Sequence, residues 1–319
     1  MKVSVIIPMY NEESCISTTI EKVAAAMEKP NYDWELLLIN DGSTDNTLDV
    51  CKKYENSNKR IKICSYPNNM GRGKALKVGF SNASGDIIVT TESDLTWGTD
   101  VLLKMIDILT QSSTDVVIAS PYAPGGKLVG VSILRHILSR VGNKVLSFAL
   151  GGSLTMLSGM TRAYKRNVID SLDLMANDKE IHLEILSKVM AMGYNIKETP
   201  AILKWEKPKE KQKTRKSTFR YGKYILSHLL FSFNETPFLL IGTIGITFLL
   251  LGIIAAIYTI YLKFTVTLVG RFTIITLTTL LLVVGIQILI FLFLANQNRD
   301  IRKELIRTKG AILRLNKKK

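Results

Sequence analysis

The chain has 319 residues, enough for one large domain or two modest ones, and its formal net charge is +15. Residues 1–203 carry 22 basic and 22 acidic side chains, so the whole excess lies in residues 204–319, around two long apolar runs. This distribution argues against a nucleic-acid-binding protein, and we expect no nucleic-acid partner.

Short β-branched and apolar runs alternate with helical patterns in the first 120 residues. The predicted strands are Val3–Ile7, Glu35–Ile39, Ile61–Ser65, Asp86–Thr90 and Asp115–Ala119. Helices are predicted over Cys15–Met27 and Asp100–Thr110. Strands that alternate with helices indicate an α/β domain with a mostly parallel sheet.

Acidic and hydroxyl residues follow these predicted strands at their carboxyl ends. The segments are Pro8–Glu12, Asn40–Asp45, Tyr66–Gly71 and Thr91–Asp94. In an open parallel sheet the carboxyl ends lie at one edge, where ligands bind. We therefore expect Tyr10, Glu12 and Asp41 to converge on one crevice.

Two short motifs at this edge suggest a diphosphate site. Glu92 and Asp94 are two carboxylates that could hold a divalent cation, although acidic pairs at strand ends are often only solvated turns. Arg72 and Lys74 lie in a glycine-containing segment that opens a helix, which suits a phosphate ligand. The alternative there is a glycine turn with solvated basic residues.

After residue 120 the alternation of predicted strands and helices becomes less regular. Residues Leu134–Leu150 predict an amphipathic helix that carries Arg135, Ser139 and Arg140. A second amphipathic pattern, Phe219–Phe233, predicts a helix lying on a membrane surface. The three cysteines have no metal-ligand spacing and are typical of a reducing compartment.

Two apolar runs, Thr236–Leu262 and Phe272–Asn298, contain no charged residue, and each exceeds the roughly 20 residues that cross a bilayer. Nine basic residues lie in 204–223 and nine in 299–319, whereas the segment between the runs holds two. Because basic residues favour the cytoplasmic side, we expect both flanks to be cytoplasmic and to attract anionic lipid. The last twenty residues could form a further surface helix.

Four segments together resemble the family-2 glycosyltransferases of the GT-A fold. They are Ser4–Glu13, Asn40–Asp45, Asn69–Ala75 and Ser158–Tyr164. More narrowly, they resemble the polyprenyl-phosphate (dolichyl- or undecaprenyl-phosphate) mannosyl- and glucosyltransferases. The resemblance covers about residues 1–233. It implies a GT-A catalytic domain with a Rossmann-like, mostly parallel sheet, followed by an interfacial helix and two transmembrane helices.

The resemblance also implies site residues. The residues that would bind the nucleotide sugar are Pro8, Tyr10, Glu12 and Asp41, beside Arg72 and Lys74. Glu92 and Asp94 would hold Mg²⁺ or Mn²⁺ and the diphosphate, with Asp94 catalytic. The residues that would bind the acceptor phosphate are Arg135, Ser139, Arg162 and Lys216.

Three positions depart from the family pattern. Glu92 stands where relatives usually have Asp, Thr96 where many have a metal-binding Gln, and Pro121 where a Ser-Arg-Tyr motif usually lies. The longer side chain of Glu92 could move it to an outer-shell role at the metal. The departures keep a catalytically impaired nucleotide-sugar-binding scaffold open as an alternative.

The residues also favour a lipid phosphate as acceptor. A sugar hydroxyl needs a base to remove its proton, whereas a lipid phosphate is already anionic. The candidate acceptor region offers the cations Arg135, Arg140, Arg162 and Lys216 and no obvious base. The chain also lacks the Gln-x-x-Arg-Trp string of processive polysaccharide synthases.

The predicted function is therefore a membrane-bound transferase that moves a hexose from a GDP-mannose or UDP-glucose type of donor to a polyprenyl phosphate. A different lipid or glycan acceptor is the other alternative, and a homo-oligomer is possible. The predicted domains are residues 1–216 (catalytic), 217–235 (interfacial helix), 236–298 (transmembrane hairpin) and 299–319 (basic cytoplasmic tail).

Overall fold

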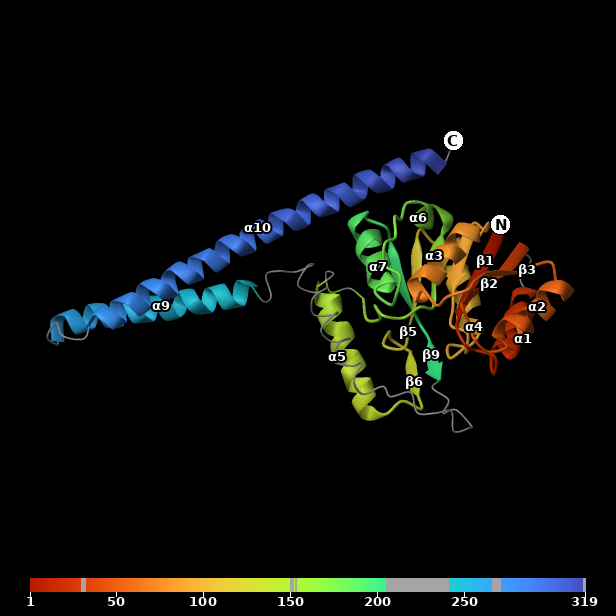
Figure 1. The fold of residues 1–319 in the computed structure, drawn as a ribbon, viewed down its shortest axis with the longest axis horizontal. Helices are drawn as coiled ribbons and strands as arrows, with labels where there is room; N and C mark the ends of the chain where they lie inside the picture. The colour runs from red at the N-terminus through yellow and green to blue at the C-terminus, as the bar shows by residue number, and fades with distance from the viewer. Residues whose placement is uncertain (30–32, 150–151, 153, 205–240, 266–270, 318–319) are drawn as a thin grey trace. The chain divides into compact units, whose positions relative to one another are not determined.

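The computed structural model describes residues 1–29, 33–149, 152, 154–204, 241–265 and 271–317. Its contacts divide the chain into two compact units. The first comprises Met1–Lys216 with Leu305–Lys319, and the second comprises Ser217–Glu304. The first unit contains a sheet with helices around it, and the second contains long apolar helices (Figure 1).

A seven-stranded sheet of order β3-β2-β1-β4-β7-β5-β8 forms the centre of the first unit. Its strands are β1 (Lys2–Met9), β2 (Asp33–Asp41), β3 (Ile61–Tyr66), β4 (Ile87–Thr90), β5 (Val116–Ser120), β7 (Arg162–Lys165) and β8 (Ile196–Pro200). Strand β7 runs antiparallel to β4 and β5, and the other pairs are parallel. The short strands β6 (Lys127–Val129) and β9 (Ile202–Lys204) pair separately.

Helices cover both faces of this sheet. The helices described before residue 205 are α1 (Ile16–Met27), α2 (Thr47–Ser57), α3 (Arg72–Asn82), α4 (Asp100–Gln111), α5 (Ile133–Ala149), α6 (Arg166–Asp170) and α7 (Ile181–Ala191). Gly79 of α3 packs on Ile6 of β1, whereas Cys51 of α2 lies against Met9 of the same strand. Because side chains three residues apart on a strand face opposite sides, α2 and α3 cover opposite faces of the sheet. With both faces covered, β1 and β2 are continuous buried runs rather than alternating ones.

The α/β fold with a mostly parallel sheet is confirmed. Each of the five predicted strands overlaps an observed strand, and the three predicted helices that lie in the first 150 residues correspond to α1, α4 and α5. Strand β7 was not expected, because the sequence pattern loosens before it. The surface helix expected over Phe219–Phe233 lies outside the described residues.

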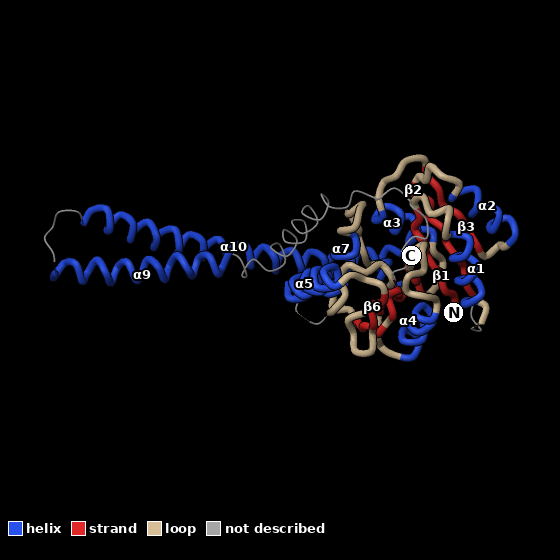
Figure 2. The backbone as a smooth tube through the Cα atoms, turned by 90° about the horizontal axis from the view of Figure 1, so that it is seen from below, coloured by secondary structure: helices blue, strands red, loops and turns tan. Residues whose placement is uncertain are grey.

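Among its described residues, the second unit has two helices long and apolar enough to cross a membrane, α9 (Ile241–Thr265) and the first part of α10 (Arg271–Lys317). They run side by side (Figure 2). A Cβ atom on Gly285 of α10 would lie 2.8 Å from the backbone nitrogen of Leu249. Small residues at a helix contact let two apolar helices approach closely, as is usual in membranes.

Helix α10 continues past its apolar part to Lys317, and Leu305–Lys317 belongs to the first unit. The last twenty residues could form a further surface helix by their sequence. Their described part, residues 300–317, is helical and continues the helix that carries the second apolar run.

We predict that Gly285→Leu destabilises the helix pair. The added side chain would meet the backbone of α9, and overpacking of this kind costs about 1–3 kcal/mol. The measurement is thermal unfolding in detergent, with Ile286→Leu as the control because Ile286 is 49% exposed. Equal unfolding temperatures for the two variants would contradict the close contact.

Candidate active site

The loops that follow β1 and β2 are bonded to each other. The backbone N–H of Asn11 donates to Ser43 Oγ at 3.0 Å, and the N–H of Thr44 donates to Asn11 Oδ1 at 2.8 Å. Asn11 has a φ of 56°, in the left-handed region that asparagine tolerates better than most residues. The structure thus brings the Pro8–Glu12 and Asn40–Asp45 segments together at one edge of the sheet.

Pro8, Tyr10 and Glu12 lie at or near this edge. Pro8 is buried beyond Ile6, the last β1 residue that pairs with β4, so its missing N–H costs no bond between these strands. Tyr10 and Glu12 are half-buried. The N–H of Glu12 donates to Thr47 Oγ1 at 2.8 Å, which fixes the loop on the start of α2.

Asp41, the last residue of β2, is buried and holds the loop that follows β3. Its carboxylate accepts hydrogen bonds from the N–H of Met70 at 2.8 Å, the N–H of Gly71 at 3.0 Å and Asn69 Nδ2 at 3.0 Å. Hydrogen bonds to a carboxylate are among the stronger ones in proteins. Asp41 therefore fixes the backbone that leads into α3, and its predicted contact with the nucleoside stays a prediction.

Helix α3 begins at Arg72, at the same edge. Gly71, just before it, has a φ of 92°, which favours glycine. The positive end of a helix dipole and a basic side chain such as Arg72 are well suited to a phosphate. Lys74 is half-buried, and its N–H donates to the carbonyl of Asn177 at 3.1 Å.

The two acidic residues after β4 have different surroundings. Glu92 Oε2 accepts hydrogen bonds from Thr96 Oγ1 at 2.9 Å and Trp97 Nε1 at 3.0 Å. Burial raises the pKa of Glu92, the charge of Arg72 lowers it, and the charge of Asp94 raises it further. Asp94 itself is exposed and accepts a hydrogen bond from the N–H of Thr96 at 3.2 Å.

These residues fit a divalent cation shared with a substrate. Magnesium usually binds one or two carboxylates and takes its other ligands from phosphate and water. Asp94 is the exposed carboxylate, and Glu92, held by Thr96 and Trp97, suits the outer-shell role that its length suggested. Among the described residues no three His, Cys, Asp or Glu side chains form a metal-binding group. An all-protein metal site is therefore absent from that part of the chain.

The turn after β4 is strained and is bonded to α1. Leu95 has a φ of 48°, a conformation that costs about 1–3 kcal/mol for a non-glycine residue. The carbonyl of Ser93 accepts hydrogen bonds from Thr19 Oγ1 at 2.6 Å and from Cys15 Sγ at 3.5 Å. These contacts hold the acidic turn in place beside the loop after β1.

Cys15 is a member of this edge that the sequence did not single out. Its Sγ lies 3.3 Å from Glu12 Oε2, and burial together with the Glu12 charge raises the pKa of the thiol to about 12. The thiol is therefore protonated near neutral pH and acts as a donor between two loops. A lone cysteine at the start of a helix carries no sequence signal for this role.

The region expected to receive the acceptor is built around α5. Ser139 Oγ accepts a hydrogen bond from Tyr122 Oη at 2.8 Å, and Asn143 Oδ1 accepts one from the N–H of Leu157 at 2.8 Å. Arg140 is exposed. Arg135 also lies on α5, whereas Lys216 lies outside the described residues. The acceptor roles of Arg135, Ser139 and Lys216 stay predictions.

Arg162, at the start of β7, is fully buried. Its Nη1 donates to the carbonyl of His182 at 2.9 Å and its Nη2 donates to the carbonyl of Leu157. The guanidinium thereby joins the segment before β7 to the first turn of α7. A direct contact with acceptor phosphate stays a prediction, and full burial between two main-chain carbonyls is typical of an arginine that supports the fold instead.

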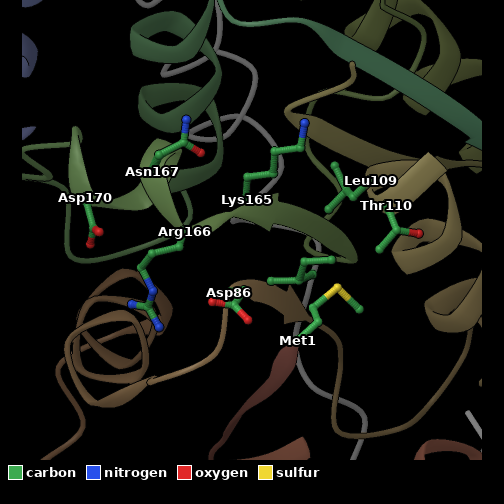
Figure 3. A pocket seen from close by; sticks show the side chains of 9 residues that line it. Met1, Asp86, Leu109, Thr110, Lys165, Arg166, Asn167 and Asp170 are labelled. Carbon is green, nitrogen blue, oxygen red and sulfur yellow. The ribbon is translucent and has the colours of Figure 1, made fainter. Parts of the chain in front are cut away.

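A shallow pocket of about 440 Å³ lies at the opposite end of the sheet. Its walls come from the start of the chain, the residues that open β4, the end of α4 and the junction of β7 with α6 (Figure 3). Asp86 precedes β4, whereas Glu92 and Asp94 follow it. This pocket is therefore separate from the acidic and basic residues described above, and open parallel sheets bind their ligands at the other edge.

Known proteins are similar to this chain in sequence. A family model described as "Glycosyl transferase family 2" matches residues 4–173. Undecaprenyl-phosphate 4-deoxy-4-formamido-L-arabinose transferase of Yersinia enterocolitica is 27% identical over 191 residues, which are 60% of this chain and 56% of that protein. The protein of the same name from Salmonella paratyphi A is 29% identical over 198 residues, with the same shares. The match thus spans little more than half the length of these relatives.

Solved structures share the fold. Glucosyl-3-phosphoglycerate synthase of Mycobacterium tuberculosis, in complex with uridine diphosphate, has a TM-score of 0.55 at 19% identity and covers 72% of this chain and 79% of its own. The same synthase with Mn²⁺, uridine diphosphate and glucosyl-3-phosphoglycerate has a TM-score of 0.54 at 20% identity, over the same shares of both chains.

The family model covers more than half of the chain, and the segments that it matches contain the loops after β1, β2 and β4 and the start of α3. The resemblance seen in the sequence is thereby confirmed. The chain belongs to glycosyl transferase family 2.

Proposed function

We propose that the protein is a membrane-bound glycosyltransferase that moves a sugar from a nucleotide-diphosphate sugar to a polyprenyl phosphate. The observation that carries this proposal is the edge of the sheet where Asp94 and Glu92 lie near the positive start of α3 with Arg72. The names of the curated relatives, which are undecaprenyl-phosphate sugar transferases, support the acceptor. The two long apolar helices support attachment to a membrane.

On the donor side, the protein supplies charge rather than a nucleophile. When a divalent cation is bound, it neutralises charge on the leaving diphosphate. Asp94 would hold that cation, with Glu92 behind it. Arg72 and the first N–H groups of α3 would bind the same diphosphate through charge-assisted hydrogen bonds, and Asp41 keeps those groups in place.

On the acceptor side, a phosphate oxygen would attack the anomeric carbon as the bond to the diphosphate breaks. A phosphate is anionic near neutral pH, so the site needs cations to orient it and no base to deprotonate it. Arg135 and Lys216 are the cations proposed for this role, together with the hydroxyl of Ser139. Direct displacement of this kind inverts the anomeric centre.

The finer specificity is proposed from the resemblance alone. It favours a hexose and a donor of the GDP-mannose or UDP-glucose type. The curated relatives are named for 4-deoxy-4-formamido-L-arabinose, so the donor panel must include nucleotide-linked forms of that sugar. We further propose that the catalytic domain is cytoplasmic and that its basic flanks bind anionic lipid.

Purified protein incubated with a panel of UDP- and GDP-sugars, Mn²⁺ or Mg²⁺ and undecaprenyl phosphate should form a lipid-phosphate sugar. We predict that chelation of the cation abolishes this transfer. Asp94→Asn should lower turnover at least ~100-fold, the scale of losing one preorganised electrostatic contact to the transition state. Asp100→Asn, at the start of α4, is a matched control.

Full activity of Asp94→Asn, or full activity after chelation, would contradict the cation site. The alternative of a catalytically impaired scaffold gives a different result in the same assay. A scaffold would bind a nucleotide sugar without transferring or hydrolysing the sugar with any donor in the panel.

The orientation gives a separate prediction. Because nine basic residues precede the first apolar run, nine follow the second and two lie between, Val269→Cys should react with a membrane-impermeant thiol reagent added to intact cells. Asn316→Cys should react only after the cells are permeabilised. Labelling of both variants in intact cells would mean that the orientation is wrong.

A variant of Arg162 tests whether this residue belongs to the acceptor site. The guanidinium of Arg162 donates hydrogen bonds to two carbonyls inside the fold. Arg162→Lys should therefore lower the free energy of unfolding by about 1–3 kcal/mol and weaken the binding of both substrates together. The unfolding free energy is measured by calorimetry and the KM values of both substrates by transfer kinetics, on the same preparation of the variant. A rise in the KM of the lipid phosphate alone, at unchanged stability, would instead assign Arg162 to the acceptor site.

A further inference from the structure

The loop that joins α6 to α7, Ser171–Glu180, packs against the start of α3. The carbonyl of Asn177 accepts a hydrogen bond from the N–H of Lys74 at 3.1 Å, and Lys77 Nζ donates to the carbonyl of Met175 at 3.1 Å. A Cβ atom on Gly73 would lie 2.7 Å from the carbonyl oxygen of Ala176. The loop therefore lies directly on the turn of α3 that carries Arg72 and would bind diphosphate.

Glu184, on the first turn of α7, fixes the shape of this loop. Its carboxylate accepts hydrogen bonds from the N–H groups of Met175, at 2.9 Å, and Ala176, at 2.8 Å. Lys188, one turn later, lies 2.6 Å from Glu184 and also donates to the carbonyl of Asp173. Both side chains of this pair are mostly buried, with exposed fractions of 15% and 16%.

The other side of the loop contacts the end of α10. Lys309 Nζ lies 2.5 Å from Asp173 Oδ2, and its hydrogen bond lowers the pKa of Asp173. Gly310 is buried, and a Cβ atom there would lie 3.3 Å from the carbonyl oxygen of Ser171. The loop is thus held from α7 on one side and from Leu305–Lys317, here called the tail segment, on the other.

The tail segment also contacts the end of α7. Arg307 Nε donates to the carbonyl of Ala191, in the last turn of α7, at 2.7 Å. Cations are favourable at the carboxyl end of a helix. The guanidinium of Arg314 lies 4.7 Å from the centre of the Tyr194 ring, within the range of a cation–π contact. Several contacts spread over two turns of helix make this a built surface rather than one exposed ion pair.

We propose that Glu184 and Lys309 are positioning residues for the donor site, and that the tail segment acts on the start of α3 through the α6–α7 loop. Neither residue touches the diphosphate. They set the position of the N–H groups and of Arg72 that would bind it. This inference rests on the proposed function for the identity of the ligand, and on the contacts above for the path.

Glu184 and the tail segment should differ in how strongly they affect the loop. The tail segment is the last part of the helix that carries the second apolar run. Glu184 holds the loop through buried hydrogen bonds, whereas the Lys309–Asp173 pair is largely exposed, and exposed ion pairs contribute little by themselves. Glu184 should therefore matter more than any one contact of the tail segment.

The test uses the full-length protein in detergent and two variants, Glu184→Gln and the double variant Arg307→Ser with Lys309→Ser. The matched control, Arg302→Ser with Lys303→Ser, removes the same charge from the same helix. Binding of uridine or guanosine diphosphate with Mn²⁺ is measured by calorimetry, and protection of the α6–α7 loop by hydrogen exchange. The KM values of the nucleotide sugar and the lipid phosphate are measured in parallel.

We expect Glu184→Gln to weaken nucleotide binding ~10-fold and the tail double variant to weaken it ~3-fold, with faster exchange in the loop. The KM of the lipid phosphate should be unchanged in both variants. In the control variant, nucleotide binding and loop exchange should also be unchanged. Unchanged loop exchange in both variants, or faster exchange with unchanged nucleotide binding, would overturn the proposal. Weaker nucleotide binding in a protein that transfers no sugar to a lipid phosphate would uphold it and reject the proposed acceptor.

Discussion

The carboxylate of Asp41 is the contact on which the candidate site depends. It is buried at the end of a central strand and accepts hydrogen bonds from the N–H groups of Met70 and Gly71. These bonds fix the path of the chain from β3 to the start of α3 at Arg72. Without these bonds the backbone of that turn would be left with unpaired polar groups, each costing about 1–3 kcal/mol. The positive start of α3 is thereby held at the edge where β1, β2 and β4 end.

The other parts of the first unit reinforce the same edge from different directions. The loops after β1 and β2 bond to each other through Asn11, and the acidic turn after β4 is tied to α1 through Ser93. From the far side, the α6–α7 loop packs on α3 and is itself held by Glu184. A site for a charged ligand gains from such support, because preorganised dipoles need not move when charge develops.

The sequence was sufficient for the features that depend on local pattern. Buried strands, the polar segments at their ends and two apolar helices all follow from periodicity and composition, and the family follows from short motifs. It was insufficient where contacts are distant in the chain. The antiparallel β7, the bond from Arg162 to the carbonyl of His182 and the contact of Lys309 with Asp173 each join residues whose pairing no local pattern encodes. An arginine in a family motif reads as a ligand for phosphate, whereas here two main-chain carbonyls bind it.

The most direct test of this account is a structure determined with a nucleoside diphosphate and Mn²⁺. We expect the cation to lie against the carboxylate of Asp94 and the diphosphate to lie between the cation and the first turn of α3, near Arg72. A diphosphate bound in the pocket at the opposite end of the sheet, beside Asp86 and Arg166, would contradict it. So would a nucleotide at the correct edge whose diphosphate makes no contact with either Asp94 or α3.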